Sequence, residues 1–207
     1  MGVQLTPSDY VHLHNHTHHS LLDGLTKIPD LIGAVKNMGM EAVAITDHGT
    51  MSGVIEFYKA AKDGGVKPII GMEAYVASRS RHDRDPQKDK ARYHLIILAM
   101  NNVGYQNLMQ LSTSANLEGM YYKPRIDREL LEKYNEGLII LSGCAGGEVG
   151  ENLRSDNYEE AKKIAVWYKK VFGDRYYLEM QDHGHVDSPG KWETQVKING
   201  YLETLSK

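Results

Sequence analysis

The sequence has little cysteine, no excess of positive charge and no long apolar run. Its single cysteine, Cys144, cannot form an internal disulfide, which favours a reducing compartment. The formal charge of −3 argues against broad electrostatic binding of nucleic acid by this segment alone, although a local basic patch is compatible with it. No stretch approaches the roughly 18 apolar residues that a membrane span needs, and the N-terminus lacks the apolar core of a signal peptide. We therefore expect a cytoplasmic protein with no membrane partner.

What is present fits a folded chain. Apolar residues make up 41% of the 207 residues, charged residues make up 25%, and there are only six prolines. This composition carries no signature of disorder. The length suits one domain with a sizeable core, or two small domains.

Apolar runs and helical spacings alternate along the chain. The predicted strands are Tyr10–His16, Glu41–Thr46, Pro68–Val76, Tyr93–Met100, Gly137–Ser142 and Arg175–Gln181. The predicted helices are Ile28–Met38, Ser52–Asp63, Gly104–Leu117, Asp127–Tyr134, Tyr158–Val171 and Trp192–Leu205, with Asp127 as an N-cap. Such alternation predicts an α/β fold with parallel strands covered by helices.

A barrel and an open, doubly wound sheet both satisfy this alternation. Polar residues at or just past the ends of several predicted strands favour the barrel, because barrel enzymes collect their sites from many strands at one edge. An open sheet would draw on fewer strands, at one switch point. The polar residues in question are His14, His16, Asp47, His48, Glu73 and Cys144.

A histidine run is the most informative local feature. Five of the ten histidines fall between His12 and His19, and Asp23 follows closely. Side chains two apart on a strand share a face, so an extended segment would aim His12, His14 and His16 together. Converging imidazoles near a carboxylate suit Zn²⁺, Mn²⁺ or Fe²⁺. A solvated patch or a tag remnant is the alternative, but the histidines alternate with apolar residues, unlike a tag.

Short motifs follow one another as in a known superfamily. They are His14-x-His16, Ser20-Leu-Leu-Asp23-Gly24, Ile45-Thr-Asp-His48-Gly49, Gly71-Met-Glu73, Tyr93-His94-Leu95 and Ser142-Gly-Cys144. In this order they resemble the PHP (polymerase and histidinol phosphatase) superfamily. The segment Gly119-Met-Tyr-Tyr-Lys-Pro-Arg125 further resembles the N-terminal PHP domain of the bacterial replicative DNA polymerase III alpha subunit family.

The resemblance implies a distorted (β/α)7 barrel over residues 1–207 that binds two or three divalent ions (Zn, Mn or Fe). The implied metal ligands are His14, His16, Asp23, His48, Glu73, His94 and Cys144. Glu73 would bridge two ions, and the first five ligands would carry catalysis through water that the ions activate. The family pattern ends with an Asp-x-His pair on a last strand that we expect to lie beyond this chain, in a longer polymerase subunit. Without that pair, we expect the chain alone to bind metal weakly and to show little turnover.

Other residues receive supporting roles. We expect Asp47 to hydrogen-bond to a ligand or its loop rather than to a metal. We expect His12 either to play the same supporting role or to pack on its strand, rather than to bind metal. Lys123 and Arg125 either contact phosphate or hold their loop against the body. The dense run Arg79–Arg92 is either a solvated loop or a contact to a nucleic-acid backbone, and such runs are more often solvated.

Three functions are compatible with the sequence. The first is a metal-dependent phosphoesterase with 3′–5′ exonuclease chemistry in DNA replication, whose partners are the primer end and other replicase subunits. The second is a non-catalytic module in which ions staple the domain and brace the polymerase. The third is a free-standing small-molecule phosphatase of the histidinol phosphatase type, which the polymerase-like Tyr121–Arg125 segment disfavours.

Overall fold

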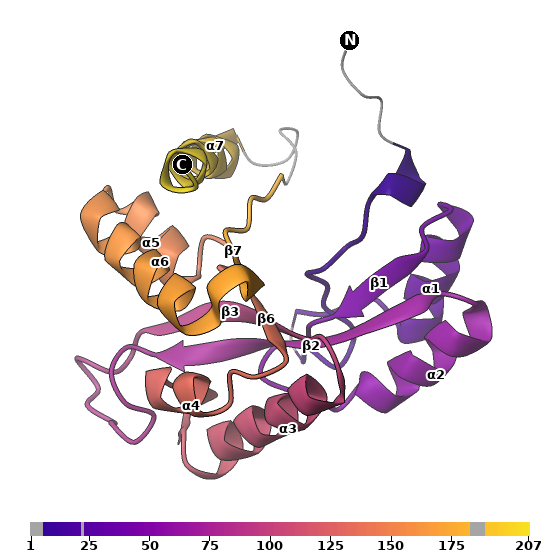
Figure 1. Ribbon diagram of the computed structural model, residues 1–207, viewed down its shortest axis with the longest axis horizontal. Helices are drawn as coiled ribbons and strands as arrows, with labels where there is room; N and C mark the ends of the chain where they lie inside the picture. Colours follow the sequence, from indigo (N-terminus) through magenta and orange to yellow (C-terminus); the bar gives the residue numbers. More distant parts are fainter. Residues whose placement is uncertain (1–5, 22, 183–188) are drawn as a thin grey trace.

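A curved, mixed sheet forms the centre of the molecule, with helices packed around its outer face (Figure 1). The computed structural model describes residues 6–21, 23–182 and 189–207. The strands are β1 Ala42–Ile45, β2 Lys67–Ala77, β3 Arg92–Ala99, β4 Met120–Tyr121, β5 Lys123–Ile126, β6 Leu138–Leu141 and β7 Tyr176–Tyr177. The α-helices are α1 Ile28–Asn37, α2 Val54–Gly64, α3 Asn102–Leu117, α4 Arg128–Lys133, α5 Glu148–Arg154, α6 Tyr158–Phe172 and α7 Pro189–Leu205. Short 3₁₀ turns span Pro7–Asp9 and Gly173–Arg175. No helix in these described ranges is long and apolar enough to cross a membrane.

Six of the seven described strands follow the order β4-β5-β2-β3-β6-β7, and the seventh, β1, pairs with β2. Strand β2 is the longest, and two strands share one of its edges. Its first half pairs with β1 up to Ile70, and its second half pairs with β5 from Tyr75 onwards. Glu73 lies between these two pairings, opposite the isolated bridge partner His48.

Period-two alternation sorts the side chains of the central strands. The outward-facing residues Met72, Ala74, Leu95, Ile97 and Ile140 join the main core under the helices. The inward-facing residues Ala44, Ile96, Leu98 and Leu141 form a smaller apolar cluster. Glu73 pairs with Ile96 and Tyr75 pairs with His94, so these four side chains share the inner face. The alternation therefore aims a carboxylate and an imidazole at the same space.

The expectation that all strands run parallel is wrong for β3. Strand β3 is antiparallel to both of its neighbours, β2 and β6, and β4 is antiparallel to β5. A parallel return needs a crossover connection, usually a helix. Residues 78–91, which link β2 to β3, contain none, so the chain returns as a long hairpin.

Two predicted strands are shorter than the sequence pattern indicates. Tyr10–His16 contains only an isolated bridge, from His12 to Val43. Within Arg175–Gln181, only Tyr176 and Tyr177 form a strand. The other predicted helices and strands lie within a few residues of the observed ones, and Asp127 caps α4 by accepting a hydrogen bond from the backbone N–H of Leu130. Helix α5 and the β4–β5 hairpin were not predicted.

The Arg79–Arg92 loop is anchored by charge pairs and by a buried guanidinium. Arg125 is fully buried, and its guanidinium donates to the backbone carbonyls of Gly119, Arg81, Asp83 and Asp89 at 3.1, 3.0, 2.8 and 3.5 Å. Arg79 forms a bidentate salt bridge with buried Asp89, with hydrogen bonds of 2.8 and 2.7 Å. Of the two roles considered for Arg125, its contacts are those of holding the loop, since its donors face away from solvent. Most of the run Arg79–Arg92 is exposed or half-buried, as expected of a solvated loop, but Arg81 and Asp89 are buried and tie it to the body.

We predict that Arg125→Ala destabilises the protein more than the loss of an exposed arginine of the same loop. Several buried carbonyls would lose their donor, and one unsatisfied buried group costs about 1–3 kcal/mol. Urea unfolding should therefore show a loss of at least ~2 kcal/mol. The matched control is Arg84→Ala, an exposed residue, for which we expect a change within about 0.5 kcal/mol. Equal losses in the two variants would contradict this role for Arg125.

Candidate metal centre

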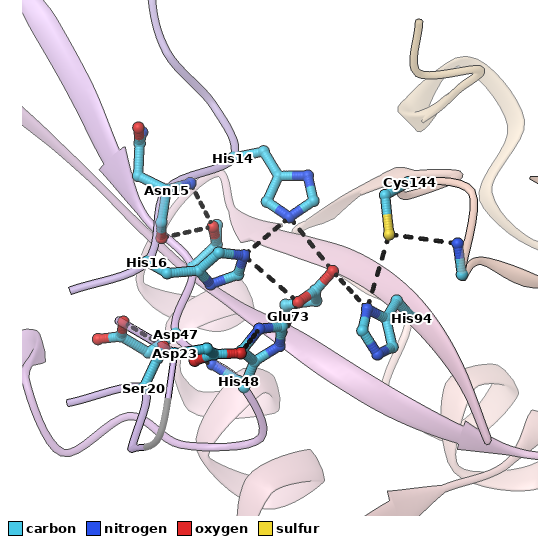
Figure 2. Close-up of polar contacts among 12 residues, drawn as sticks. His14, Asn15, His16, Ser20, Asp23, Asp47, His48, Glu73, His94 and Cys144 are labelled. Atoms are coloured by element: carbon cyan, nitrogen blue, oxygen red, sulfur yellow. Dashed lines mark hydrogen bonds and ion pairs between the residues drawn. The ribbon is translucent and has the colours of Figure 1, made fainter. Parts of the chain in front are cut away.

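Glu73 is the centre of the site. Its side chain is 1% exposed, and four imidazoles surround its carboxylate (Figure 2). Oε1 lies 3.2 Å from His14 Nε2 and 3.1 Å from His94 Nδ1. Oε2 lies 3.5 Å from His16 Nε2 and also contacts His48 Nδ1. The backbone of Glu73 is held by Asp47 and Gly49, through bonds of 3.1 and 2.8 Å.

These donors form two groups that share Glu73. One group is His14, His16 and Glu73, and the other is His48, His94 and Glu73. Within each group, one ligand atom per residue lies within 4.8 Å of the others. A shared carboxylate is the arrangement that a bridging ligand requires. A further contact extends the second group, since Asp23 Oδ2 lies 2.9 Å from His48 Nε2.

The spacing of the donor atoms suits a shared divalent cation better than it suits hydrogen bonds among the donors themselves. In the described part of the chain, both carboxylate oxygens of Glu73 and the Nδ1 atoms of His16 and His48 are buried without a well-formed hydrogen bond. His14 Nε2 and His16 Nε2 lie 3.2 Å apart, a separation that fits either a hydrogen bond between the rings or two ligands of one ion. Two atoms bound to one tetrahedral zinc ion at about 2.0–2.1 Å lie about 3.3 Å apart. Imidazole and carboxylate donors at this spacing suit Zn²⁺, Mn²⁺ or Fe²⁺.

The electrostatics of the metal-free site follow from burial and contact. Burial acts to raise the pKa of Glu73, but contacts with His14, His48 and His94 hold it far below its usual range. Burial acts to lower the pKa of His14, yet Glu179 and Glu73 outweigh it and raise that pKa to about 10. Burial does lower the pKa of His16. Contacts with the Cys144 thiol and with Glu73 raise the pKa of His94 to about 10.

A backbone irregularity places His14 and His16. The backbone N–H groups of Ala44 and Thr46 donate to the carbonyls of His12 and Asn15, so the N-terminal segment carries one extra residue against β1. The amide of Asn15 donates to the carbonyls of His12 and Ala44, at 3.0 and 3.2 Å, which satisfies the bulged backbone. The rings of His14 and His16 then meet edge to face, with centroids 5.0 Å apart. The ring of His12 packs edge to face against Tyr10, with centroids 4.9 Å apart.

Asp47 fixes the loop that follows the histidine pair. Its carboxylate is buried and accepts from the Thr17 N–H at 2.6 Å, the Thr17 hydroxyl at 2.8 Å and the Ser20 hydroxyl at 2.7 Å. The Ser20 hydroxyl in turn accepts from the His48 N–H at 3.1 Å. Asp47 thus links the loop after the histidine pair to His48, and its supporting role toward a bound metal stays a prediction. The loop requires glycine at position 24, because a Cβ there would lie 1.8 Å from the Thr17 carbonyl oxygen.

Cys144, the predicted sulfur ligand, lies at one end of the site. Cys144 Sγ is 3.6 Å from His94 Nδ1 and accepts from the Gly146 N–H at 3.3 Å. The backbone N–H of His94 bonds the Gly146 carbonyl, so the loop after β6 is tied to β3. Cys144 therefore lies close to the His48–Glu73–His94 group.

Two residues at the opposite end were not predicted. Glu179 Oε1 lies 2.7 Å from His14 Nδ1, and Gln181 Nε2 lies 3.1 Å from the same nitrogen. The Ser142 hydroxyl accepts from the Glu179 N–H at 2.8 Å, which positions the segment after β7. Glu179 follows the short strand β7 in the sequence, and the expected position of polar residues just past a strand end was the signal that could have found it.

A cavity adjoins the centre. It has a volume of about 520 Å³, and its lining includes His48, Tyr75, His94, the acidic residues Asp23 and Glu151 and the basic residues Lys90, Arg92 and Lys123. Lys123 Nζ lies 5.4 Å from the centre of the Tyr75 ring. Of the two residues considered for phosphate contact, Lys123 faces this cavity and Arg125 does not.

Fold and site together define a mixed α/β protein with a histidine–carboxylate centre on the concave face of its sheet. The family model described as "PHP domain" matches residues 12–183. The chain belongs to the PHP domain family.

Its relatives include several proteins named DNA polymerase III subunit alpha. The one from Borreliella burgdorferi is 49% identical over 94% of this chain, and 17% of that protein is covered. The one from Thermus aquaticus is 49% identical over 96% of this chain and 16% of its own length. The one from Aquifex aeolicus is 52% identical over 84% of this chain and 15% of its own length. The chain thus spans about a sixth of the length of these relatives.

A solved structure supports the fold. A Bifidobacterium adolescentis protein described as a metal-dependent phosphoesterase superposes with a TM-score of 0.50 over 93% of this chain and 84% of its own, at 14% identity.

We predict that Asp47→Asn weakens metal binding although Asp47 contacts none of the donor atoms directly. The asparagine amide has one acceptor fewer than the carboxylate and no charge. It should therefore bind Thr17 and Ser20 less tightly, and the loop next to His48 should loosen. Loss of such supporting hydrogen bonds typically costs 10–100-fold in metal affinity. Competition titration with zinc measures this change. The control is Asp63→Asn, an exposed residue in α2, for which affinity should not change. An unchanged zinc affinity in Asp47→Asn would show that the loop does not position the ligands.

Proposed function

We propose that this chain is the N-terminal PHP domain of a replicative polymerase subunit, and that its centre hydrolyses phosphodiesters at DNA 3′ ends. The buried carboxylate of Glu73, shared by two groups of imidazoles, is the observation that carries the proposal. Such a donor set suits two or three divalent ions, which in this chemistry activate water and stabilise charge on phosphate oxygens. Relatedness to DNA polymerase III alpha subunits supports DNA and other replicase subunits as the partners.

Each predicted ligand has a distinct task in this proposal. His14 and His16 would hold one ion together with Glu73, and His48 and His94 would hold another with the same carboxylate. Cys144 lies beside His94 and would serve as an additional donor. Asp23, with its side chain 56% exposed, contacts His48 and would be available to a further ion.

The adjoining cavity supports a phosphate-bearing substrate. Lys90, Arg92 and Lys123 bring three cationic groups to a wall next to His48 and His94. The aromatic face of Tyr75 holds the Lys123 ammonium by a cation–π contact, which keeps that charge at the wall. A single-stranded end offers phosphates to such groups and bases to the nearby aromatic rings.

The second candidate is a structural module in which ions staple the domain. The observation that favours it is the wide separation of the donors along the chain. The centre joins the N-terminal segment, the loop after β1, β2, β3 and the loop after β6, and contacts through Glu179 add the segment after β7. Binding free energy at such a site is also folding free energy, whether or not turnover occurs.

We predict that divalent metal stabilises the fold through Glu73. At a free zinc concentration about 100 times Kd, binding adds about 2.7 kcal/mol, which corresponds to roughly 5–10 °C in Tm for a chain of this size. Calorimetry with zinc and then with excess chelator should show this shift in the wild type. Glu73→Gln should lose most of it, and the exposed control Glu136→Gln should retain it. A chelator-insensitive wild-type Tm would contradict metal binding at this centre.

We predict Mn²⁺- or Zn²⁺-dependent release of nucleotides from single-stranded DNA 3′ ends by the full-length protein. The double variant His14→Ala/Glu73→Ala should lose this activity by at least about 100-fold. Lys123→Ala should raise KM by roughly tenfold, the size of one charge-assisted contact, while the exposed control Lys133→Ala leaves KM unchanged. If wild type and double variant release nucleotides equally slowly, the structural function is the remaining one.

A further inference from the structure

We infer that His18, His19 and Glu56 form a second transition-metal site, separate from the Glu73 centre. One ligand atom from each residue lies within 4.8 Å of the others. The three residues come from two elements, since the histidines follow the His14–His16 pair and Glu56 lies in the first turn of α2. None of them belongs to the predicted ligand set, and none contacts Glu73.

The ring of His19 is held in a binding orientation. Its Nε2 faces Glu56 Oε2 at 3.3 Å, and its Nδ1 lies 3.3 Å from the Ser52 hydroxyl. The Thr50 hydroxyl donates to that same Ser52 oxygen at 3.1 Å. A hydrogen bond on the far nitrogen is how metal-binding histidines are usually oriented.

Gly53 leaves the space that the His19 ring occupies. A Cβ on Gly53 would lie 2.7 Å from Cδ2 and 3.1 Å from Cγ of His19. The absence of a side chain at the first residue before α2 therefore lets the imidazole lie directly against the helix end. The carboxylate of Glu56 offsets the partial positive charge that this helix end would present to a cation.

The separation of His19 Nε2 and Glu56 Oε2 matches two ligands of one metal ion better than it matches a hydrogen bond between the two side chains. An N–H···O hydrogen bond to a charged group is typically about 2.7–2.9 Å long, and the observed separation is 3.3 Å. Two atoms bound to one tetrahedral ion at about 2.0–2.1 Å lie about 3.3 Å apart. The exposed ring of His18, whose centroid is 4.4 Å from that of His19, supplies the third donor.

The chemical class of the ligand follows from the donors. Two imidazoles and one carboxylate suit Zn²⁺, Co²⁺, Ni²⁺ or Cu²⁺ rather than Mg²⁺ or Ca²⁺. Three protein donors leave a fourth position for water. Since Glu56 is on α2 and the histidines lie on the loop leading to Asp23, a bound ion would tie that loop to the helix.

The test counts zinc per chain by equilibrium dialysis and metal analysis on the whole protein. His19→Gln and Glu56→Gln should each bind one equivalent less than the wild type. The control is His82→Gln, whose exposed ring lies 3.9 Å from Glu118 without a third donor nearby, and it should bind the wild-type amount. Gly53→Ala should retain the ligands but weaken this one equivalent about tenfold by displacing the ring.

A second measurement keeps the result independent of the Glu73 centre. Zinc added beyond the first equivalents should shift the ring ¹⁵N resonance of His19 Nε2, as seen by NMR. Equal zinc content in all variants, or an unshifted His19 resonance at saturation, would overturn the inference. Neither outcome depends on DNA hydrolysis, so the two proposals fail separately.

Discussion

A carboxylate that is almost completely buried is the constraint on which this structure depends. Moving a charge such as that of Glu73 out of water costs far more than one hydrogen bond returns, so the surroundings must supply compensating charge or donors. Four imidazoles supply them here, from segments far apart in the sequence. With their protons the imidazoles themselves act as the compensating cations. Without their protons they leave lone pairs aimed at the same space, where a metal cation would take over that role.

The register of the strands around β2 brings the imidazoles to the buried carboxylate of Glu73. Glu73 lies where β2 has left β1 and has not yet met β5, so its edge is open to the loop carrying His48. The antiparallel return of β3 places His94 opposite Tyr75, two residues beyond Glu73 on the same face. A slip of one residue would turn His94 outward, into the apolar core. The buried hydrogen bonds of Arg125 hold the loop that sets this return.

Sequence reasoning succeeded where the information is local. The apolar runs predicted β1, β2, β3 and β6 closely, and the motifs brought out the histidines and the carboxylate that the structure gathers. It missed the direction of β3, because strand direction depends on whether the connection contains a helix, and the charged run before β3 has no clear period. It missed Glu179, whose contact with His14 spans 165 residues. It also left open the role of Arg125, because the same side chain can serve phosphate or buried carbonyls equally well.

In the proposal the same ligands would serve both stability and chemistry, so the ligand set does not by itself separate the two functions. Ions held among five segments would tighten the fold even if no substrate ever reached them. The cavity beside the centre adds a different kind of evidence, because its lining brings Lys90, Arg92 and Lys123 close to a site that would already hold cations, with Asp23 and Glu151 as its acidic residues. A purely structural site has no use for this excess of positive charge, whereas an anionic substrate would neutralise it. These basic residues therefore strengthen the argument for phosphodiester hydrolysis that begins with the shared carboxylate of Glu73.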